Sequence, residues 1–206
     1  MKKSYLRTSL ALACALGLGA CGGSDDEQLQ LVVNLFGVTK TGMTISNGGA
    51  AAVPVGPGAV FLFPALVPLD SDYDIKIVTR PPNTDSCEVF NGKGNTGSFT
   101  PNNIVIQCIV TTYTLGGTVS GLVGGNLVVN NGAQKVTIPA GATTFTMTTP
   151  TTANPKLGQV AEDTPYGLTI LEQPAGLNCV IGEPNGVMPA AAVTNIAIKC
   201  TPKAAV

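Results

Sequence analysis

Short segments in which apolar and polar residues alternate recur along most of the chain. A period of two residues places alternate side chains on opposite faces of a β-strand. No segment after position 30 shows sustained helical periodicity. The pattern therefore predicts an all-β protein of short, half-buried strands. The clearest alternating positions are Ile75/Ile77, Ile104/Ile106/Cys108, Val136/Ile138, Leu168/Ile170 and Ile196/Ile198/Cys200.

Turn signals separate these segments. Asn-Gly pairs, which supply positive φ between strands, occur at 47–48, 91–92, 131–132 and 185–186. Seven short strands in about ninety residues are typical of an antiparallel sandwich of immunoglobulin-like class. In the second half of the chain the expected strands lie near 112–120, 125–130, 134–138, 143–148, 166–172, 178–182 and 193–200.

The chain also contains an internal duplication. The segment from Cys87 to Cys108 aligns without a gap on the segment from Cys179 to Cys200, and both intervals are 21 residues. Repeats of this kind indicate repeated structural units. We expect two tandem β-sandwich units, residues 31–110 and 111–202, the first being the more diverged. Further matching segments are 43–48 with 127–132 and 73–81 with 166–174.

The first twenty residues differ from the rest. Lys2, Lys3 and Arg7 precede an apolar run of about eleven residues, which is shorter than the roughly 20 that a spanning helix needs. This combination is typical of a secretory signal. The run ends in Leu18-Gly19-Ala20-Cys21, which resembles the lipobox of bacterial lipoproteins. An ordinary secretory signal followed by a coincidental cysteine is the alternative.

The lipobox resemblance carries expectations about location. In that family the signal, here residues 1–20, is removed and the cysteine, here Cys21, is acylated. Gly22 after the cysteine, in place of an aspartate, implies transfer to the outer membrane in Gram-negative lipoproteins. Residues 21–30 would then form a polar tether that reaches at most about 35 Å. Acyl chains would make the membrane a partner.

Four cysteines remain beyond the lipobox, and exported proteins retain disulfides. Four cysteines allow three pairings. The duplication favours Cys87–Cys108 and Cys179–Cys200, because each unit then carries its own bond. A four-thiolate metal site would lack any Cys-x-x-Cys pair, and a redox-active disulfide would lack close spacing and basic neighbours.

The second unit resembles a known repeat. Segments 115–122, 130–132, 173–179 and 193–200, together with Tyr166, resemble tandem immunoglobulin-like β-sandwich repeats of bacterial lipoproteins and secreted proteins. Its first segment, 115–122, is also similar to carboxypeptidase-regulatory-like, transthyretin-type modules. In the first unit Leu35-Phe36-Gly37-Val38 stands in for the Gly-Gly-Thr-Val opening at 116–119. The resemblance implies a structural or adhesive role and supplies no catalytic residues.

Composition narrows the function classes further. The chain has no histidine and no tryptophan, and 11% of its residues are charged. Mechanisms built on an imidazole base are therefore excluded. Without residues 1–20 the 11 basic residues fall to 8 against 12 acidic ones, a formal charge of −4. The absence of a basic stripe argues against nucleic-acid partners, and no cofactor is expected.

Three short motifs match, in part, sequence patterns of nucleotide-binding, calcium-binding and catalytic sites. The GxGxxG pattern at 92–97 has no helix after it and is expected to be a hairpin loop. Asp70, Asp72 and Asp74 alternate as in a calcium loop, but Ile75 and Pro81 stand where an EF-hand needs Gly and Glu. These aspartates are weak calcium candidates in an otherwise solvated loop. The adjacent carboxylates at 162–163 are expected to point apart, which disfavours glycoside hydrolysis.

Two function classes remain after these exclusions. The favoured one is a non-enzymatic cell-envelope lipoprotein that acts as a spacer or as an adhesive module. The alternative is a module that binds a glycan, a peptide or calcium through loops at one end of a sandwich. Its candidate loop is the stretch 143–165, about nine residues longer than its counterpart in the first unit. Phe61, Phe63 and Phe145 follow strand patterns and are expected in the core.

Overall fold

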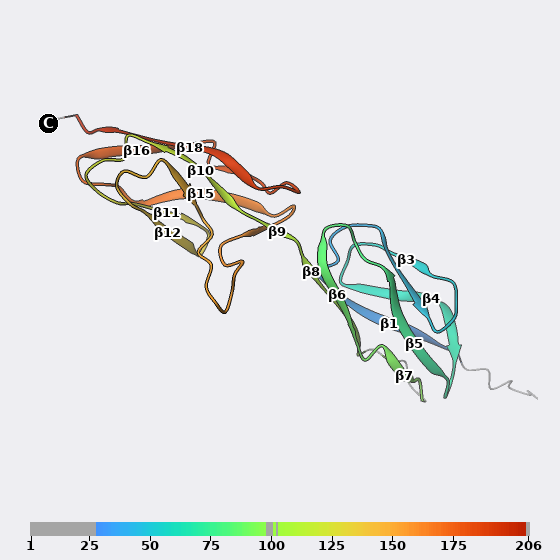
Figure 1. Cartoon of the computed structure of the whole chain (residues 1–206). Coiled ribbons are helices and arrows are strands. Elements are labelled where there is room, and N and C mark those ends of the chain that lie inside the picture. The colour runs from blue at the N-terminus through green and yellow to red at the C-terminus, as the bar shows by residue number, and fades with distance from the viewer. Residues whose placement is uncertain (1–27, 98–100, 102, 205–206) are drawn as a thin grey trace, which may run out of the picture.

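The structure, a computed structural model, describes residues 28–97, 101 and 103–204. Every regular element among these residues is a β-strand, and none forms a helix with the length and hydropathy needed to cross a bilayer. Figure 1 shows two elongated lobes arranged end to end, the N-terminal one built from β1–β8 and the C-terminal one from β9–β18. The sequence prediction of an all-β fold with sandwich units is confirmed.

The first unit is a sandwich of two four-stranded sheets, ordered β4-β1-β8-β6 and β3-β2-β5-β7. Its core lies between the sheets and includes Leu31, Ile45 and Ile106. The strands are β1 Gln28–Phe36, β2 Met43–Asn47, β3 Val53–Val55, β4 Val60–Pro68, β5 Asp72–Thr79, β6 Thr84–Phe90, β7 Lys93–Asn95 and β8 Ile104–Val110.

The second unit repeats this arrangement strand for strand. Its sheets are ordered β13-β10-β18-β16 and β12-β11-β15-β17, and its separate core includes Leu127, Leu168 and Ile198. The short pair β9–β14 has no counterpart among the described residues of the first unit. The strands are β9 Thr112–Tyr113, β10 Leu115–Ser120, β11 Leu127–Asn131, β12 Gln134–Ile138, β13 Thr144–Thr146, β14 Val160–Ala161, β15 Pro165–Glu172, β16 Leu177–Gly182, β17 Asn185–Val187 and β18 Val193–Pro202.

Each unit contains one parallel pair within its otherwise antiparallel sheets. The first and last long strands lie side by side and run in the same direction, β1 with β8 and β10 with β18. In addition, β1 begins at Gln28, inside the segment 21–30 that the sequence assigned to a tether. The strand extends this far because the residues from Gln28 to Gln30 pair with the end of β4.

Strand register corrects the expected alignment between the first long strands of the two units, β1 and β10. Leu35 lies opposite Ile106, as Val119 lies opposite Ile198. Residues 35–38 therefore match 119–122 and not the Gly-Gly-Thr-Val segment 116–119. The deciding feature is a glycine after each strand: Gly37 and Gly121 have φ values of 72° and 73°.

The structure contains both disulfides that the duplication favoured, Cys87–Cys108 and Cys179–Cys200. Each joins two directly opposed residues on neighbouring antiparallel strands, with Cα–Cα distances of 4.0 and 3.9 Å. Each bond therefore links two neighbouring strands of one sheet, and one of these two is the last strand of its unit.

Several expected strands and turns are differently placed. The expected strand at 112–120 divides into β9 and β10, and the two-residue β14 and three-residue β17 carried no periodic signal. The Asn185-Gly186 pair lies within β17, and Glu183, with φ of 49°, occupies the turn. Glycine is needed at 186 for packing, because a Cβ there would lie 2.4 Å from the Tyr166 hydroxyl.

Candidate functional site at the junction of the two units

The aspartates singled out as calcium candidates are spread around one turn and the start of β5. Asp70 occupies the turn with φ of 52°. Asp72 accepts a hydrogen bond from the Asn95 side chain at 3.1 Å, and Asp74 forms an ion pair with Lys76 at 2.7 Å. Within the described part of the chain no three metal-ligating side chains come together. The geometry gives no support to a calcium site there.

The glycine-rich segment 92–97 forms part of the second sheet of its unit. Residues 93–95 make the short strand β7, which pairs with the start of β5. Gly94 packs against the ring of Tyr73, and a Cβ there would lie 2.7 Å from the hydroxyl oxygen. This glycine thus serves side-chain packing, as Gly186 does beside Tyr166 in the second unit.

The carboxylates of Glu162 and Asp163 converge on one lysine of the other unit. Lys40, in the loop after β1, hydrogen-bonds the Glu162 carboxylate and lies 3.0 Å from the Asp163 carboxylate. The expectation that these adjacent side chains point apart is wrong. Asp163 has a φ of 61°, and this left-handed turn after β14 directs both carboxylates to the same side.

The electrostatics of this cluster favour the ion pair. The hydrogen bond to Glu162, followed by the one to Asp163, raises the pKa of Lys40 above its ordinary 10.5. Because that pKa is raised in the folded state, the contribution of Lys40 to stability is fully present below 10.5. It is lost as the pH rises through the folded value. The Glu162 carboxylate is buried, with 6% of its side chain exposed, so Lys40 supplies the charge that its burial requires.

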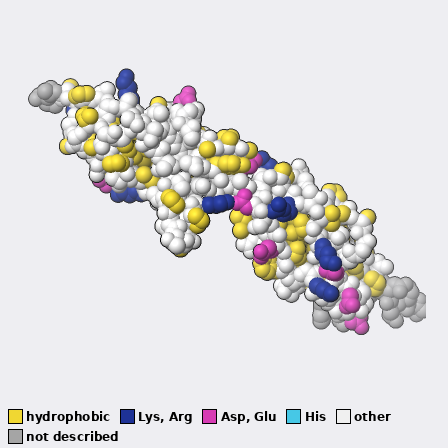
Figure 2. All heavy atoms as spheres, in the orientation of Figure 1, with side chains coloured by type: hydrophobic (Ala, Val, Ile, Leu, Met, Phe, Trp, Pro, Cys, Tyr) yellow, Lys and Arg dark blue, Asp and Glu magenta, His cyan; other side chains and the backbone are white. Residues whose placement is uncertain are grey.

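A second ion pair crosses the junction in the opposite sense. Lys156, in the long loop of the second unit, contacts the carboxylate of Asp85 in β6 of the first. Figure 2 shows a lysine or arginine side chain beside an acidic one where the two lobes meet. The hydrogen bond from Lys156, with a smaller one from Thr111, lowers the pKa of Asp85 below 3.8. This contribution is present above pH 3.8 and is lost as the pH falls through the folded value.

The connection between the units is hydrogen-bonded on both sides. Thr111, the single residue between β8 and β9, donates its N–H to the Asn83 carbonyl at 2.9 Å and accepts the Glu162 N–H at 3.0 Å. Its hydroxyl donates to Asp85 at 2.9 Å. At the next residue, the Thr112 hydroxyl donates to the Gln159 side chain at 2.7 Å.

The long loop of the second unit supplies one side of this connection. Its residues 160–161 form β14, which pairs with β9 directly after the connection. Asn83, only 2% exposed, supplies the other side, because its carbonyl accepts the Thr111 N–H while its side-chain amide donates to Thr39 in the Lys40 loop at 2.8 Å. The junction is therefore braced by the hydrogen bonds of Thr111 to both units and by ion pairs that cross it in both directions.

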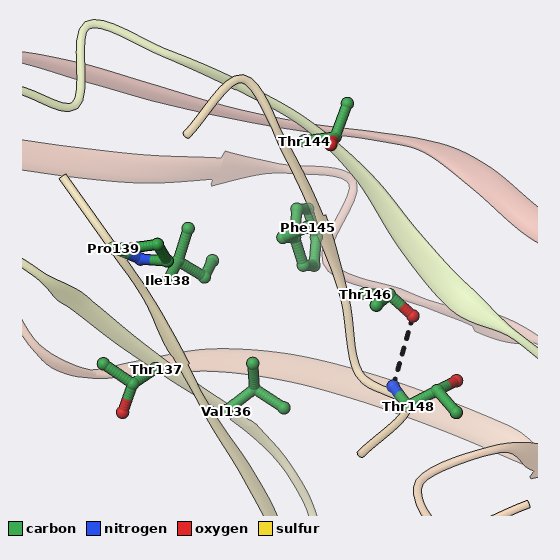
Figure 3. A pocket seen from close by; sticks show the side chains of 8 residues that line it. All are labelled: Val136, Thr137, Ile138, Pro139, Thr144, Phe145, Thr146 and Thr148. Atoms are coloured by element: carbon green, nitrogen blue, oxygen red, sulfur yellow. Dashed lines mark hydrogen bonds between the residues drawn. The ribbon is translucent and has the colours of Figure 1, made fainter. Parts of the chain in front are cut away.

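A shallow groove of about 360 Å³ lies elsewhere in the second unit, between the edge strands β12 and β13. Figure 3 shows Val136, Ile138 and Phe145 around this space, and the Thr148 N–H bonded to the Thr146 hydroxyl at 3.2 Å. The groove has no ionisable side chain in its lining. In the first unit Phe61 corresponds to Phe145, and it packs edge to face on the buried Phe63 at the same edge. Phe63 and Phe145 are thus buried in the cores and Phe61 packs partly buried against the first core, as the strand pattern indicated.

Comparisons with known proteins give only distant similarities. No protein-family model matches the chain, and no curated protein matches it. Among solved structures, the shaft pilin SpaA from Lactobacillus rhamnosus GG superposes with a TM-score of 0.30 at 12% identity. That alignment covers 87% of this chain and 100% of the pilin. The major pilin T-13 of Streptococcus pyogenes gives a TM-score of 0.26 at 11% identity over 86% and 97% of the two chains. Similarities of this size carry no functional argument.

Proposed function

We propose that the chain is a non-enzymatic spacer of the bacterial cell envelope, a braced two-unit rod held at a membrane by a lipid on Cys21. The observation that carries the spacer role is the junction. Units joined by a short linker move relative to one another by default. Here the linker residue Thr111 is hydrogen-bonded to both units, and ion pairs span the boundary in both directions.

The placement of the termini suits such a role. Strands β1 and β8 run in parallel, so the chain enters the first unit at the end remote from the second. Figure 1 shows the end of β18 at the opposite end of the molecule from the start of β1. A membrane anchor before β1 would therefore hold the second unit away from the bilayer. Cys21 itself lies outside the described residues.

The braced junction predicts that the two units tumble as one body. Replacing both bridging lysines (Lys40→Ala with Lys156→Ala) removes the ion pairs and leaves the buried Glu162 carboxylate without its cation. We expect the rotational correlation times of the two units, measured by ¹⁵N relaxation, to separate in this variant and to agree in the wild type. Separation of the units returns the Glu162 carboxylate to water, so the cost of its unpaired burial falls on the junction and each unit should remain folded.

Two exposed lysines supply the control for this experiment. Lys76 pairs with Asp74 at 2.7 Å and Lys135 with Glu172 at 3.2 Å, each within one unit. The double variant Lys76→Ala with Lys135→Ala removes the same charge without touching the junction. The spacer role loses its support if the wild-type units already tumble independently, or if both double variants behave as the wild type does.

Membrane anchoring is tested separately at Cys21. In cells that express the full chain, the wild type should fractionate with membranes and Cys21→Ser should move to the soluble fraction. Loss of the acyl chains removes about 0.8 kcal/mol of membrane affinity per buried methylene. Intact-mass measurement of the purified wild type should show the added acyl mass. An unmodified Cys21 would contradict the lipid anchor and leave the braced rod intact.

The ligand-binding alternative loses its main candidate loop. Residues at the end of the insertion, Gln159 to Glu162, are engaged with the linker, and Lys156 contacts the first unit. The insertion therefore has a structural use at the junction. No observation at the loop favours a glycan, a peptide or calcium over this use.

A further inference from the structure

The outer face of one sheet in the first unit is unusually apolar. On the sheet β4-β1-β8-β6, six large hydrophobic side chains point away from the core and are 45–59% exposed. Twelve large hydrophobic side chains are exposed in the described part of the chain, so half of them gather on this one face. We call these six the apolar face: Phe36, Val60, Leu62, Leu66, Phe90 and Ile109.

Strand register shows that the face is continuous across the sheet. Val60, Asn34, Val105 and Phe90 lie in one row over all four strands. Neighbouring strands are about 4.8 Å apart, so this row spans roughly 15 Å. Phe36 occupies the next outward position along β1 after Asn34, and therefore lies in the neighbouring row of the same face. An apolar surface of this extent on a monomer marks an interaction site more often than chance exposure does.

The second unit shows that the fold does not require this apolar surface. Its matching sheet β13-β10-β18-β16 carries small or polar residues at the register positions of five of the six, and β13 ends before a counterpart of Leu66. Both sheets cover a hydrophobic core and carry a cross-strand disulfide in the same place. The face is thus a property of the first unit alone. The matching pairs are Phe36 with Ser120, Val60 with Thr144, Leu62 with Thr146, Phe90 with Gly182 and Ile109 with Thr201.

We propose that this face binds a second copy of the same chain, sheet against sheet. Half-exposed side chains of this size each leave about 100 Å² accessible, so two faces would bury about 1,200 Å² together. That area lies at the lower limit of specific interfaces and fits a dimer of modest affinity. Two flat sheet faces pack about 10 Å apart with their strands nearly aligned, as sheets do inside sandwiches.

The polar groups of the face are compatible with pairing to itself. Among the outward positions of the four strands, Glu88 on the edge strand β6 is the one ionisable side chain, so the centre brings no like charges together. Asn34, near the middle, donates its side-chain amide to the Ile104 carbonyl at 3.3 Å. This hydrogen bond within the sheet persists when the face is covered, which reduces the cost of burying the amide.

The direction of the strands also fits a second copy. A two-fold axis along β1 and β8 would place both N-terminal segments at the same end of the pair. If the anchor of the proposed function holds, both lipids would then enter one bilayer. Confinement to one surface raises the effective concentration, so an interface of modest area suffices there.

The test is sedimentation equilibrium of the full chain, purified from the cell envelope in density-matched detergent, over about 5–500 µM, a range chosen for weak affinities. The face variant (Phe36→Ser, Val60→Thr and Leu62→Thr) introduces the residues that the second unit has at those positions. The control variant (Val78→Thr, Leu171→Thr and Val187→Thr) changes equally exposed side chains elsewhere. The single change Phe36→Ser serves as a milder version if the triple variant folds poorly.

We expect the wild type and the control variant to approach twice the monomer mass and the face variant to remain monomeric. A wild type that stays monomeric overturns the proposal, as does a face variant that dimerises like the wild type. A monomeric wild type whose Cys21→Ser form binds phosphatidylcholine vesicles through this face would identify a lipid surface as the occupant, which also overturns it. The double lysine variant of the junction should dimerise normally, so failure of the spacer role and failure of this proposal are distinguishable.

Discussion

Replacing Gly121 with alanine is expected to lower the free energy of unfolding of the second unit by about 3 kcal/mol. Gly121 has a φ of 73°, and a Cβ there would lie 2.2 Å from the carbonyl oxygen of Cys200. Backbone atoms cannot yield as a flexible side chain can, so the parallel pairing of β10 with β18 must shift. Urea unfolding followed residue by residue in ¹H–¹⁵N spectra assigns the loss to this unit.

Gly124 is the matched control for this substitution. It has the same φ of 73°, but no atom lies within 4 Å of the position its Cβ would take. Gly124→Ala should therefore cost only the left-handed backbone strain, about 1 kcal/mol. The difference between the two variants isolates the close approach to β18. Equal losses would show that backbone conformation alone explains the glycine, and the account of Gly121 would then be wrong.

The fold was accessible from sequence because its main signals are local or repeated. Alternation marks the long strands, and the duplicated cysteine segments place two strands of each unit side by side. The shortest strands were not predicted, because two or three residues are too few to show an alternating pattern. In β17, glycine serves packing on Tyr166, so the Asn-Gly pair that signals a turn elsewhere does not form one.

The junction could not be predicted in the same way. Lys40 and Glu162 are 122 residues apart, and neither carries a local signal that names the other. The convergence of Glu162 and Asp163 depends on one positive φ at Asp163, which residue type alone does not specify. The length of the loop in the second unit was visible, but its use depends on pairing with β9. The length of the loop shows that the second unit has residues that the first lacks, and only the contacts show that these residues pack at the junction.

The apolar face shows a different limit of pattern reasoning. The segment of β4 from Val60 to Pro68 is entirely apolar, so the strand pattern that placed Phe61 and Phe63 in the core did not predict that the apolar residues on the other face would be exposed. Register against β1 makes the distinction, since Phe61 lies opposite the buried Val33 while Leu62 and Val60 point outward. The comparison with Thr144 and Thr146 in the second unit then shows which apolar residues the fold does not need.

Removing one disulfide is expected to destabilise only the unit that contains it. In the chain-entropy model, closing a loop of this length contributes about 3 kcal/mol, so Cys179→Ala with Cys200→Ala should lower the stability of the second unit by about that amount. Cys179 and Cys200 are both buried in the core of that unit, so a smaller side chain adds a packing loss. Urea unfolding under non-reducing conditions measures the change.

The corresponding variant of the first unit, Cys87→Ala with Cys108→Ala, provides the comparison. Its loop has the same sequence separation of 21, so the entropic loss should be equal, whereas Cys87 is only partly buried and the packing loss should be smaller. The two cores share no residue, so each double variant should leave the other unit's unfolding midpoint unchanged. If either variant unfolded both units together, the junction would be coupling their stabilities. The braces between Lys40, Lys156 and their carboxylates would then do more than orient the units.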